Sequence, residues 1–371
     1  MNRLSACRLL PVTLILVVLL VSCANDIDLF RQDQEKEYVV FGLLNSSDPL
    51  QQVKVRLTSI SDAPLEELIT DSSEFSAPEN LQVMVQEWYN QDYAIYNLEP
   101  VDYEKEPGVF FNTRNTIYES RFNPDMDMEY KLIISNPDSG DLITSKIVPV
   151  PAPILGAPSW PWIHYSFSYD ADPFNIRFKE VPRVYVYLIR FTIRYLEVGF
   201  GNDSVIRENS YVFKPRYSND PPEYEATREN SGNEHNRSMT KIYTYNVMRI
   251  SIPDRDQVLY RQLICFKVSV WGGDQNLRNY IELGTKFTDN RRYMFSNINN
   301  GIGVFGACSY SACDGVLPDQ AFLDSLPLNT RTASLKFRTE LYKERQSGMS
   351  FRPDNATDQD FIDIIKEIGN E

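Results

Sequence analysis

The chain has 371 residues, of which 37 are Lys or Arg and 51 are Asp or Glu, so its formal net charge at pH 7 is −14. A surface of this charge repels nucleic-acid phosphates, and no basic cluster interrupts it, which argues against nucleic acid as a partner. The 22 Tyr and 20 Phe are too many for a disordered stalk. Together with a low count of two His, they favour a folded chain rich in β-structure.

The N-terminus has the three parts of a bacterial lipoprotein signal. Arg3 and Arg8 supply a basic start, and residues 9–21 form an apolar run that falls short of the roughly 20 residues needed to span a bilayer. The run ends in Leu-Val-Ser-Cys, and small residues before a cysteine suit a signal peptidase that cuts there after acylation of the thiol. We therefore expect residues 1–22 to be removed and Cys23 to anchor the protein in a membrane through its acyl chains. The alternative is an ordinary secretory signal with an incidental cysteine.

A polar tether over residues 23–37 precedes a series of period-two patterns. In one of these runs Val53, Val55 and Leu57 alternate with polar side chains, as in a strand with one buried face. The expected strands cover residues 38–44, 51–59, 81–88, 108–112, 116–120, 129–135 and 142–148. Short strands separated by Asn-, Pro- and Asp-rich turns, with no convincing helix, predict a β-sandwich of immunoglobulin or prealbumin type over residues 38–148.

Prolines gather over residues 149–158, and they predict a stiff linker because proline lacks the backbone donor that strand pairing needs. A second β-rich domain with a short helix is expected over residues 159–345. Its clearest strand is 185–198, whose apolar face runs from Tyr185 to Tyr195. The opposite face is apolar at first and then turns to Arg and Thr, so we expect this strand to be covered on both sides early and wet on one side later.

Further elements of the second domain follow from composition and periodicity. They are an exposed loop over 215–240, strands over 241–252 and 263–271, a short helix over 274–283 and a last strand over 333–342. The helix is predicted because Leu277, Tyr280 and Ile281 share one face after an Asp cap. A polar tail over 346–371 has Phe and Ile at helical spacing within 357–369, which predicts a short amphipathic helix.

Two cysteines, Cys308 and Cys313, enclose the short sequence CSYSAC. We expect this sequence to be a small loop closed by a disulfide, which is the default outside the cytoplasm. A metal site would need two more ligands, and no histidine is near in sequence. Cys265 lies in an apolar run and is expected to be a buried thiol.

Glycines at positions 301, 303 and 306 match the spacing of the dinucleotide-binding fingerprint. That fingerprint binds pyrophosphate only where a strand precedes it and a helix follows. Here it follows an Asn-rich turn and runs into the cysteine sequence, so no helix can start in time. The glycines are better explained by a tight turn and close backbone packing, and no cofactor is expected.

No sequence pattern marks a catalytic centre. A Ser-His-Asp triad would need His164 or His235, and the nucleophile motif G-x-S-x-G is absent from the sequence. Paired carboxylates for glycoside hydrolysis stay open, because such pairing is spatial. Asp125, Asp127 and Glu129 alternate as calcium ligands do, but a solvated strand edge explains them better. We therefore expect a protein that is not an enzyme.

Aromatic side chains cluster just after the predicted linker, at Trp160, Trp162, His164 and Tyr165. Exposed rings at a domain junction stack on sugars or on protein partners, which makes these four residues the candidate ligand-binding site. The alternative, which we favour, is that Trp162 and His164 fill the interface between the two domains.

Two stretches of the C-terminal half, FKVSVWGGDQNLRNYIEL and YMFSNINNGIGVFGA, resemble Bacteroidota envelope lipoproteins grouped as domain of unknown function 4249. The N-terminal stretch EYVVFGLLNSSDP and the segment EYKLIISNPDSG look similar to the same family. The resemblance covers most of residues 23–315, and it does not extend to the cysteine sequence or the tail after it. It implies an outer-membrane lipoprotein of the kind encoded beside TonB-dependent transporters, and it carries no known catalytic residues.

Together these features predict a lipid-anchored outer-membrane protein, at the cell surface or on the periplasmic face. Its expected function is that of an accessory binding protein for a TonB-dependent transporter or another envelope protein. Two alternatives stay open. One is a structural or adhesive envelope subunit that self-assembles, and the other is a hydrolase that uses unmarked carboxylates.

Overall fold

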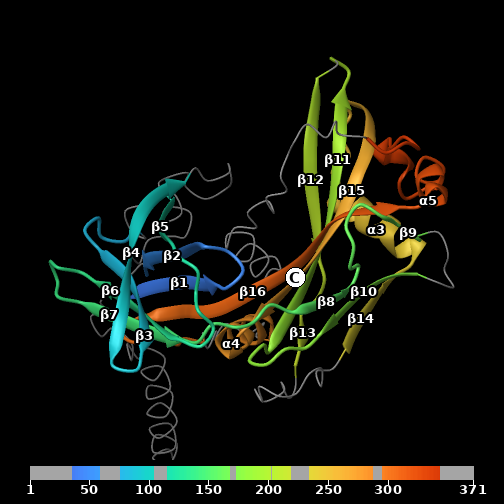
Figure 1. The fold of residues 1–371 in the computed structure, drawn as a ribbon. Coiled ribbons are helices and arrows are strands. Elements are labelled where there is room, and N and C mark those ends of the chain that lie inside the picture. The colour runs from blue at the N-terminus through green and yellow to red at the C-terminus, as the bar shows by residue number, and fades with distance from the viewer. Residues whose placement is uncertain are drawn as a thin grey trace, which may run out of the picture. The chain divides into compact units, whose positions relative to one another are not determined.

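The computed structural model describes residues 36–58, 76–103, 115–167, 173–201, 203–218, 234–286 and 295–342. From Glu37 onward these residues belong to one compact unit. The fold is mainly β with a few short helices, as predicted (Figure 1). The immunoglobulin or prealbumin type of the first domain stays a prediction.

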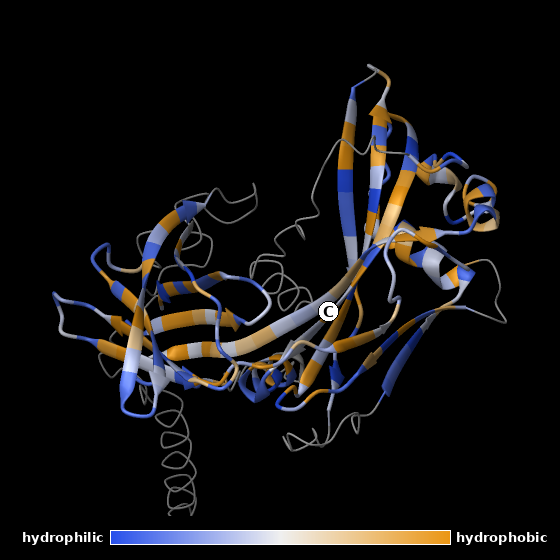
Figure 2. Ribbon diagram, in the orientation of Figure 1, coloured by the Kyte–Doolittle hydropathy of each residue, from blue (hydrophilic) through white to orange (hydrophobic). Residues whose placement is uncertain are grey.

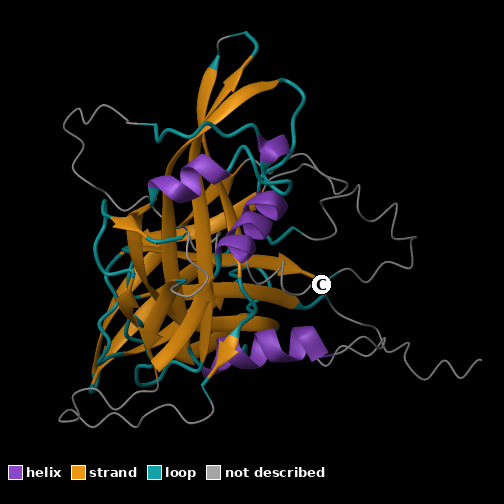
Figure 3. Cartoon of the chain, turned by 90° about the vertical axis from the view of Figure 1, so that its right-hand side faces the viewer, coloured by secondary structure: helices purple, strands orange, loops and turns teal. Residues whose placement is uncertain are grey.

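The first half of the described chain contains β1 (Tyr38–Asn45), β2 (Leu50–Leu57), β3 (Gln82–Tyr89), β4 (Asp92–Tyr103), β5 (Asn115–Arg121), β6 (Glu129–Ser135) and β7 (Leu142–Ile147). The second half contains β8 (Ile154–Ala157), β9 (His164–Tyr165), β10 (Phe174–Lys179), β11 (Val186–Gly199), β12 (Ser204–Val212), β13 (Arg216–Tyr217), β14 (Glu234–Met239), α3 (Lys241–Ser251), β15 (Val258–Gly273), α4 (Gln275–Lys286), β16 (Ile302–Pro318), α5 (Gln320–Ser325) and the 3₁₀ helix η1 (Ala333–Leu335). Figure 3 shows how few and short the helices are beside the strands.

Most strands belong to one large mixed sheet. Its order is β12-β11-β15-β16-β1-β2-β5-β4-β3-β6-β7, with β13 beside β11 and β9 beside β16. A smaller sheet has the order β14-β10-β8. Figure 2 shows much of β1 and β15 in orange, because these inner strands place apolar side chains on both faces.

Strand β16 connects the two halves of the large sheet. Its first half pairs in parallel with β1, up to Asn45 opposite Cys308. Its second half pairs in antiparallel with β15, starting from Gly273 opposite the same Cys308. The predicted first domain therefore shares one sheet with a strand from the predicted second domain.

The Pro-rich segment 149–158 is bound along β16, and part of it is a strand, which corrects the prediction of a linker. The hydroxyl of Ser309 donates to the carbonyl of Pro151 at 2.7 Å, and the hydroxyl of Ser311 donates to that of Pro153 at 2.6 Å. Proline has no N–H but keeps its acceptor, so side-chain donors replace the missing strand pairing. Residues 154–157 then form β8 and pair with β10.

Two predicted strands are wrong. Of the predicted strand 241–252, residues 241–251 form the helix α3, which begins where the side chain of Thr240 accepts from the N–H of Tyr243 at 3.2 Å. Its buried residues follow a helical spacing, namely Thr244, Tyr245, Val247 and Met248. Residues 333–342 form η1 and an irregular segment with a single bridge between Phe337 and Arg261.

The clearest predicted strand and the predicted helix are both confirmed. On β11 the residues Tyr187, Ile189, Phe191, Ile193 and Tyr195 are all buried. On the opposite face Val186 and Leu188 pack against Leu277 and Ile281 of α4. Burying each of these two helix side chains contributes about 2 kcal/mol, which holds α4 on the early, doubly covered part of the strand.

Candidate functional site

The four predicted ligand-binding residues lie in one short segment that runs beside the end of β16. We call residues 160–165 the aromatic segment. The N–H of Trp162 donates to the carbonyl of Gly315 at 2.7 Å, and β9 pairs in parallel with Leu317 and Pro318. The segment is thus an addition to the edge of β16 and has a fixed position on the sheet.

Side chains within the aromatic segment fix its backbone further. The hydroxyl of Tyr165 donates to the carbonyl of Trp160 at 2.9 Å and accepts from its N–H at 3.1 Å. Nδ1 of His164 lies 2.7 Å from the carbonyl of Pro318. A carbonyl only accepts, so Nδ1 carries a proton and donates it to this contact.

Trp162 has a left-handed backbone with φ of 62°, an unfavourable conformation for a bulky residue. Packing of the indole ring against Gly315 stabilises this strained conformation. An added Cβ at Gly315 would lie 2.6 Å from a ring carbon. The close approach explains why the sequence has glycine at this point of β16.

The aromatic segment keeps much of its apolar surface in solvent. Trp160 is 69% exposed and Trp162 is 40% exposed. The indole of Trp162 is therefore only partly packed against the protein, and that of Trp160 is mostly in solvent. A rigid backbone that presents exposed indoles loses little conformational entropy on binding, which suits recognition of a partner.

Cys308 and Cys313 are not joined, which corrects the predicted disulfide. The sequence CSYSAC is the interior of β16, where five positions along an extended strand span about 16 Å. A disulfide requires Cα atoms within about 7 Å. The small residues of this sequence, which predicted a loop, fit into the strand beside β15 and the Pro-rich segment.

Alkylation of the denatured, unreduced protein should label both Cys308 and Cys313. In the native protein both should react slowly, because the thiols are buried and burial, together with the nearby charge of Asp314, raises the pKa of Cys313 to about 11. Intact mass spectrometry after each treatment measures this. A protein that gains label only after reduction would show that the disulfide exists.

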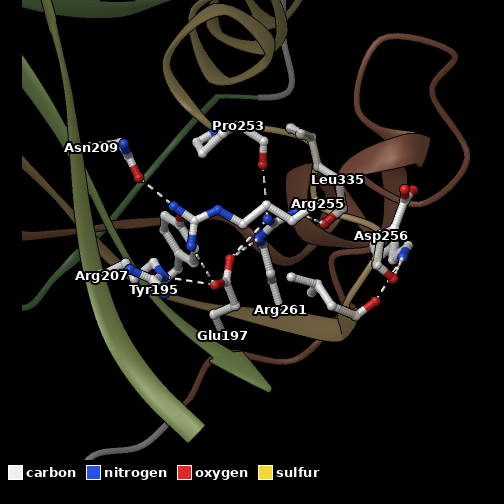
Figure 4. Close-up of polar contacts among 11 residues, drawn as sticks. Tyr195, Glu197, Arg207, Asn209, Pro253, Arg255, Asp256, Arg261 and Leu335 are labelled. Carbon is white, nitrogen blue, oxygen red and sulfur yellow. Dashed lines mark hydrogen bonds and ion pairs between the residues drawn. The ribbon is translucent and has the colours of Figure 1, made fainter. Parts of the chain in front are cut away.

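A cluster of charged residues, which sequence reasoning missed, joins β11, β12 and β15 (Figure 4). Nε and Nη2 of Arg261 donate to Oε2 of Glu197 at 3.0 and 2.8 Å. Nε of Arg207 donates to Oε1 of the same carboxylate at 2.6 Å, and Nη1 of Arg255 lies 3.3 Å from it. Arg261 is fully buried and also donates to backbone carbonyls at Leu335 and Pro253.

The charged cluster stabilises the packing of β11, β12 and β15, and it is not a proton-transfer site. Burial alone would raise the pKa of Glu197, but the hydrogen bonds and charges of Arg207 and Arg261 outweigh it and lower that pKa. A permanently ionised carboxylate with both oxygens occupied is a poor general acid or base. Glu197 and Arg261 are 64 residues apart, and the only sequence signal was a charge inside each of two apolar strands.

His235 lies beside a carboxylate and a hydroxyl, but not in the order of a catalytic triad. Its Nε2 is 2.7 Å from Oε1 of Glu180, and the hydroxyl of Ser218 donates to Oε2 at 3.2 Å. In serine hydrolases the imidazole stands between the hydroxyl and the carboxylate so that it can take the hydroxyl proton. Here the carboxylate stands between them. Over the described ranges no three His, Cys, Asp or Glu side chains converge as a metal site.

Gly303 and Gly306 of the fingerprint-like sequence lie in β16, which continues up to Pro318, and Gly301 immediately precedes this strand. Gly303 has φ of +117°, and an added Cβ would lie 2.0 Å from the carbonyl oxygen of Val40. At Gly306 an added Cβ would lie 3.1 Å from Oδ1 of Asp274, the cap of α4. These two glycines allow close backbone packing. The predicted tight turn is confined to Asn300 and Gly301, and the sequence after it is a strand.

The buried carboxyl of Asp274 should make stability depend on pH. Its burial raises the pKa to about 6, and the hydrogen bonds from Leu277, Asn276 and the backbone counteract this only in part. Because the folded pKa exceeds the unfolded value of 3.8, the folded state holds the proton more tightly, and stability falls as pH rises from about 4 to 6. The loss amounts to about 3 kcal/mol.

Asp274→Asn keeps a capping oxygen and should remove this part of the pH dependence, since no group titrates there. Urea unfolding of both proteins between pH 4 and 7 measures it. Parallel pH profiles would show that the carboxyl is not responsible.

Residues 1–22, Cys23 and the tail 346–371 lie outside the described residues. Within the described ranges, no helix has both the length and the apolar character to cross a membrane. No protein-family model matches the chain, and no curated protein matches it. The resemblance to envelope lipoproteins therefore stays a prediction.

Proposed function

We propose that this protein is a lipid-anchored binding protein of the bacterial outer membrane, which uses its aromatic segment to contact a partner in the envelope. The observation that supports this most directly is Trp160, a large indole held in solvent by a backbone that Tyr165 fixes. The sequence around Cys23 supports the anchor, and the resemblance to envelope lipoproteins supports an outer-membrane transporter as the partner.

Binding surfaces depend most on a few rigid aromatic anchors, and exposed tryptophan is prominent among them. The aromatic segment offers Trp160 and Trp162 beside Ile163, which is 45% exposed, on one short stretch of chain. The acidic character of the chain opposes binding to phosphate-rich partners, so an apolar contact with a protein fits better.

Trp160→Ala should reduce recovery of the partner about tenfold or more when the tagged protein is purified from cross-linked envelopes. Tyr89→Ala is the matched control, since Tyr89 is 62% exposed on a different hairpin, and it should leave recovery unchanged. Quantitative mass spectrometry of the co-purified barrel protein measures the effect. Equal recovery with both variants, or no barrel protein with the unaltered chain, would contradict the proposal.

Cys23→Ala should release the protein from the membrane fraction or retain it with an uncut signal, because the acyl chains have lost their attachment point. Labelling with radioactive palmitate and fractionation of the envelope measure the result. A Cys23→Ala variant that still incorporates palmitate would rule out this anchor.

A self-assembling envelope subunit is the second candidate. It is favoured by the position of β12 at one end of the large sheet, where its outer edge has no partner strand among the described residues. An exposed strand edge is a template for pairing with another chain. Light scattering that finds a monomer at every concentration would remove this candidate.

A further inference from the structure

Two arginines from different sheets, Arg216 of β13 and Arg237 of β14, lie close together. Nη2 of Arg216 donates at 3.2 Å to the carbonyl of Asn236, the residue next to Arg237. Nη2 of Arg237 donates to the hydroxyl of Tyr243 on α3 at 2.7 Å. We call Arg216, Arg237 and Tyr243 the arginine pair site.

Among the described residues, the arginine pair has no carboxylate partner. The ion pairs of the described residues include neither Arg216 nor Arg237. Burial, and then the positive charge of Arg237, lowers the pKa of Arg216, as expected of neighbouring charges of the same sign. In addition, Nε of Arg237 is buried and has no hydrogen-bond partner within the part of the chain that the structure describes.

This arrangement is costly unless something else is bound there. A partly buried guanidinium without a counter-charge loses hydration, which its hydrogen bonds and ring contacts replace only in part, and buried donors in native proteins are nearly always paired. Other arginines of this chain are paired with carboxylates, as Arg207 is with Glu197 and Arg278 is with Glu282. Acidic residues are also in excess, so a shortage of carboxylates does not explain the gap.

We propose that the arginine pair site binds a small organic anion through a carboxylate or phosphate group. Two guanidiniums supply charge and donors in the forked geometry that suits such groups. The hydroxyl of Tyr243 accepts from Arg237, so its own proton remains as a third donor.

Aromatic rings hold the guanidinium of Arg237 in place at the arginine pair site. Phe213 and Tyr243 are stacked with ring centroids 6.1 Å apart, and Tyr211 meets Phe213 edge-on at 5.1 Å. Cζ of Arg237 is 4.9 and 5.0 Å from the centroids of Phe213 and Tyr243. The site shares no residue with the aromatic segment, so it goes beyond the proposed function and is tested separately from it.

The experiment uses the full-length protein in neutral detergent at low ionic strength and neutral pH. Inorganic phosphate and benzoate are titrated by calorimetry, and the thermal midpoint is followed with sodium chloride at matched ionic strength as the reference. At least one of the two anions should bind and raise the midpoint above the chloride reference. Preference for phosphate would identify a phosphate ligand, and preference for benzoate a carboxylate on an apolar body.

Arg216→Gln and Arg237→Gln should each weaken binding about tenfold or more, because each removes a charged donor. Arg249→Gln makes the same charge change at an exposed position of α3 and should leave binding unchanged. If Arg237→Gln does not fold, Arg216→Gln decides the question, since the hydrogen bond of the Arg216 side chain among the described residues is a single one, to a backbone carbonyl. Binding of neither anion above chloride, or equal binding by Arg216→Gln and the unaltered chain, would overturn the proposal.

Discussion

Gly303→Ala is expected to lower the free energy of unfolding by about 3–5 kcal/mol, among the largest effects of any single substitution in this chain. The backbone of Gly303 has φ of +117°, which side chains rarely adopt, and a new Cβ would overlap the carbonyl oxygen of Val40. That carbonyl belongs to β1, so neither atom is the end of a flexible side chain. The strands β1 and β16 would have to separate locally, and the pairing that joins the two halves of the sheet would weaken.

Gly140→Ala is the matched control, because Gly140 also has a positive φ, of +77°, but no atom lies within 4 Å of an added Cβ. Its cost should be backbone strain alone, about 1 kcal/mol. Chemical denaturation of both variants gives the comparison. Equal losses for Gly303→Ala and Gly140→Ala would show that contact with β1 is unimportant.

Arg261→Met is expected to destabilise the protein by about 3–5 kcal/mol, the usual cost of breaking a buried ion pair from one side. The substitution keeps much of the side-chain volume but leaves Oε2 of Glu197 and the carbonyls of Pro253 and Leu335 without their donor. Arg255→Gln removes a solvent-exposed partner of the same carboxylate and should cost less than about 1 kcal/mol.

The pH dependence of the free energy of unfolding gives a second test of the charged cluster around Glu197. The pKa of Glu197 is depressed in the folded state, so its contribution to stability is present above the unfolded pKa and is lost as pH falls through the folded one. Arg261→Met should reduce that loss, which urea unfolding between pH 3 and 7 can follow. If Arg255→Gln destabilises the protein as much as Arg261→Met, the buried ion pair of Glu197 with Arg261 is not the main source of stability in this cluster.

Elements whose signal is local were predictable from the sequence. The strand β11 shows its alternation within its own residues, and α4 has a cap and an apolar stripe within one segment. In contrast, the apolar side chains of residues 241–252 fit both the two-residue repeat of a strand and the 3.6-residue repeat of a helix. The tertiary contacts of this segment favour the helix α3.

The errors around β16 have a different cause. Gly303, Cys308 and Ser309 look like turn residues when read alone, and their role as strand residues depends on β1, β15 and the Pro-rich segment, all distant in sequence. The same holds for the sites. The exposed Trp160 was identified from its own neighbourhood, but the charged cluster and the arginine pair exist only after folding brings the strands together.

The pairing of β1 with β16 also has a consequence for how the protein is made. Val39 meets Ile302, a partner 263 residues later in the chain, so the first strand of the sheet cannot complete its hydrogen bonds until nearly all of the polypeptide has emerged. Closing so long a loop is entropically expensive, and topologies with such remote contacts fold slowly. During synthesis, one edge of β1 therefore stays unpaired, and this exposed edge is where a holding chaperone would be of most use.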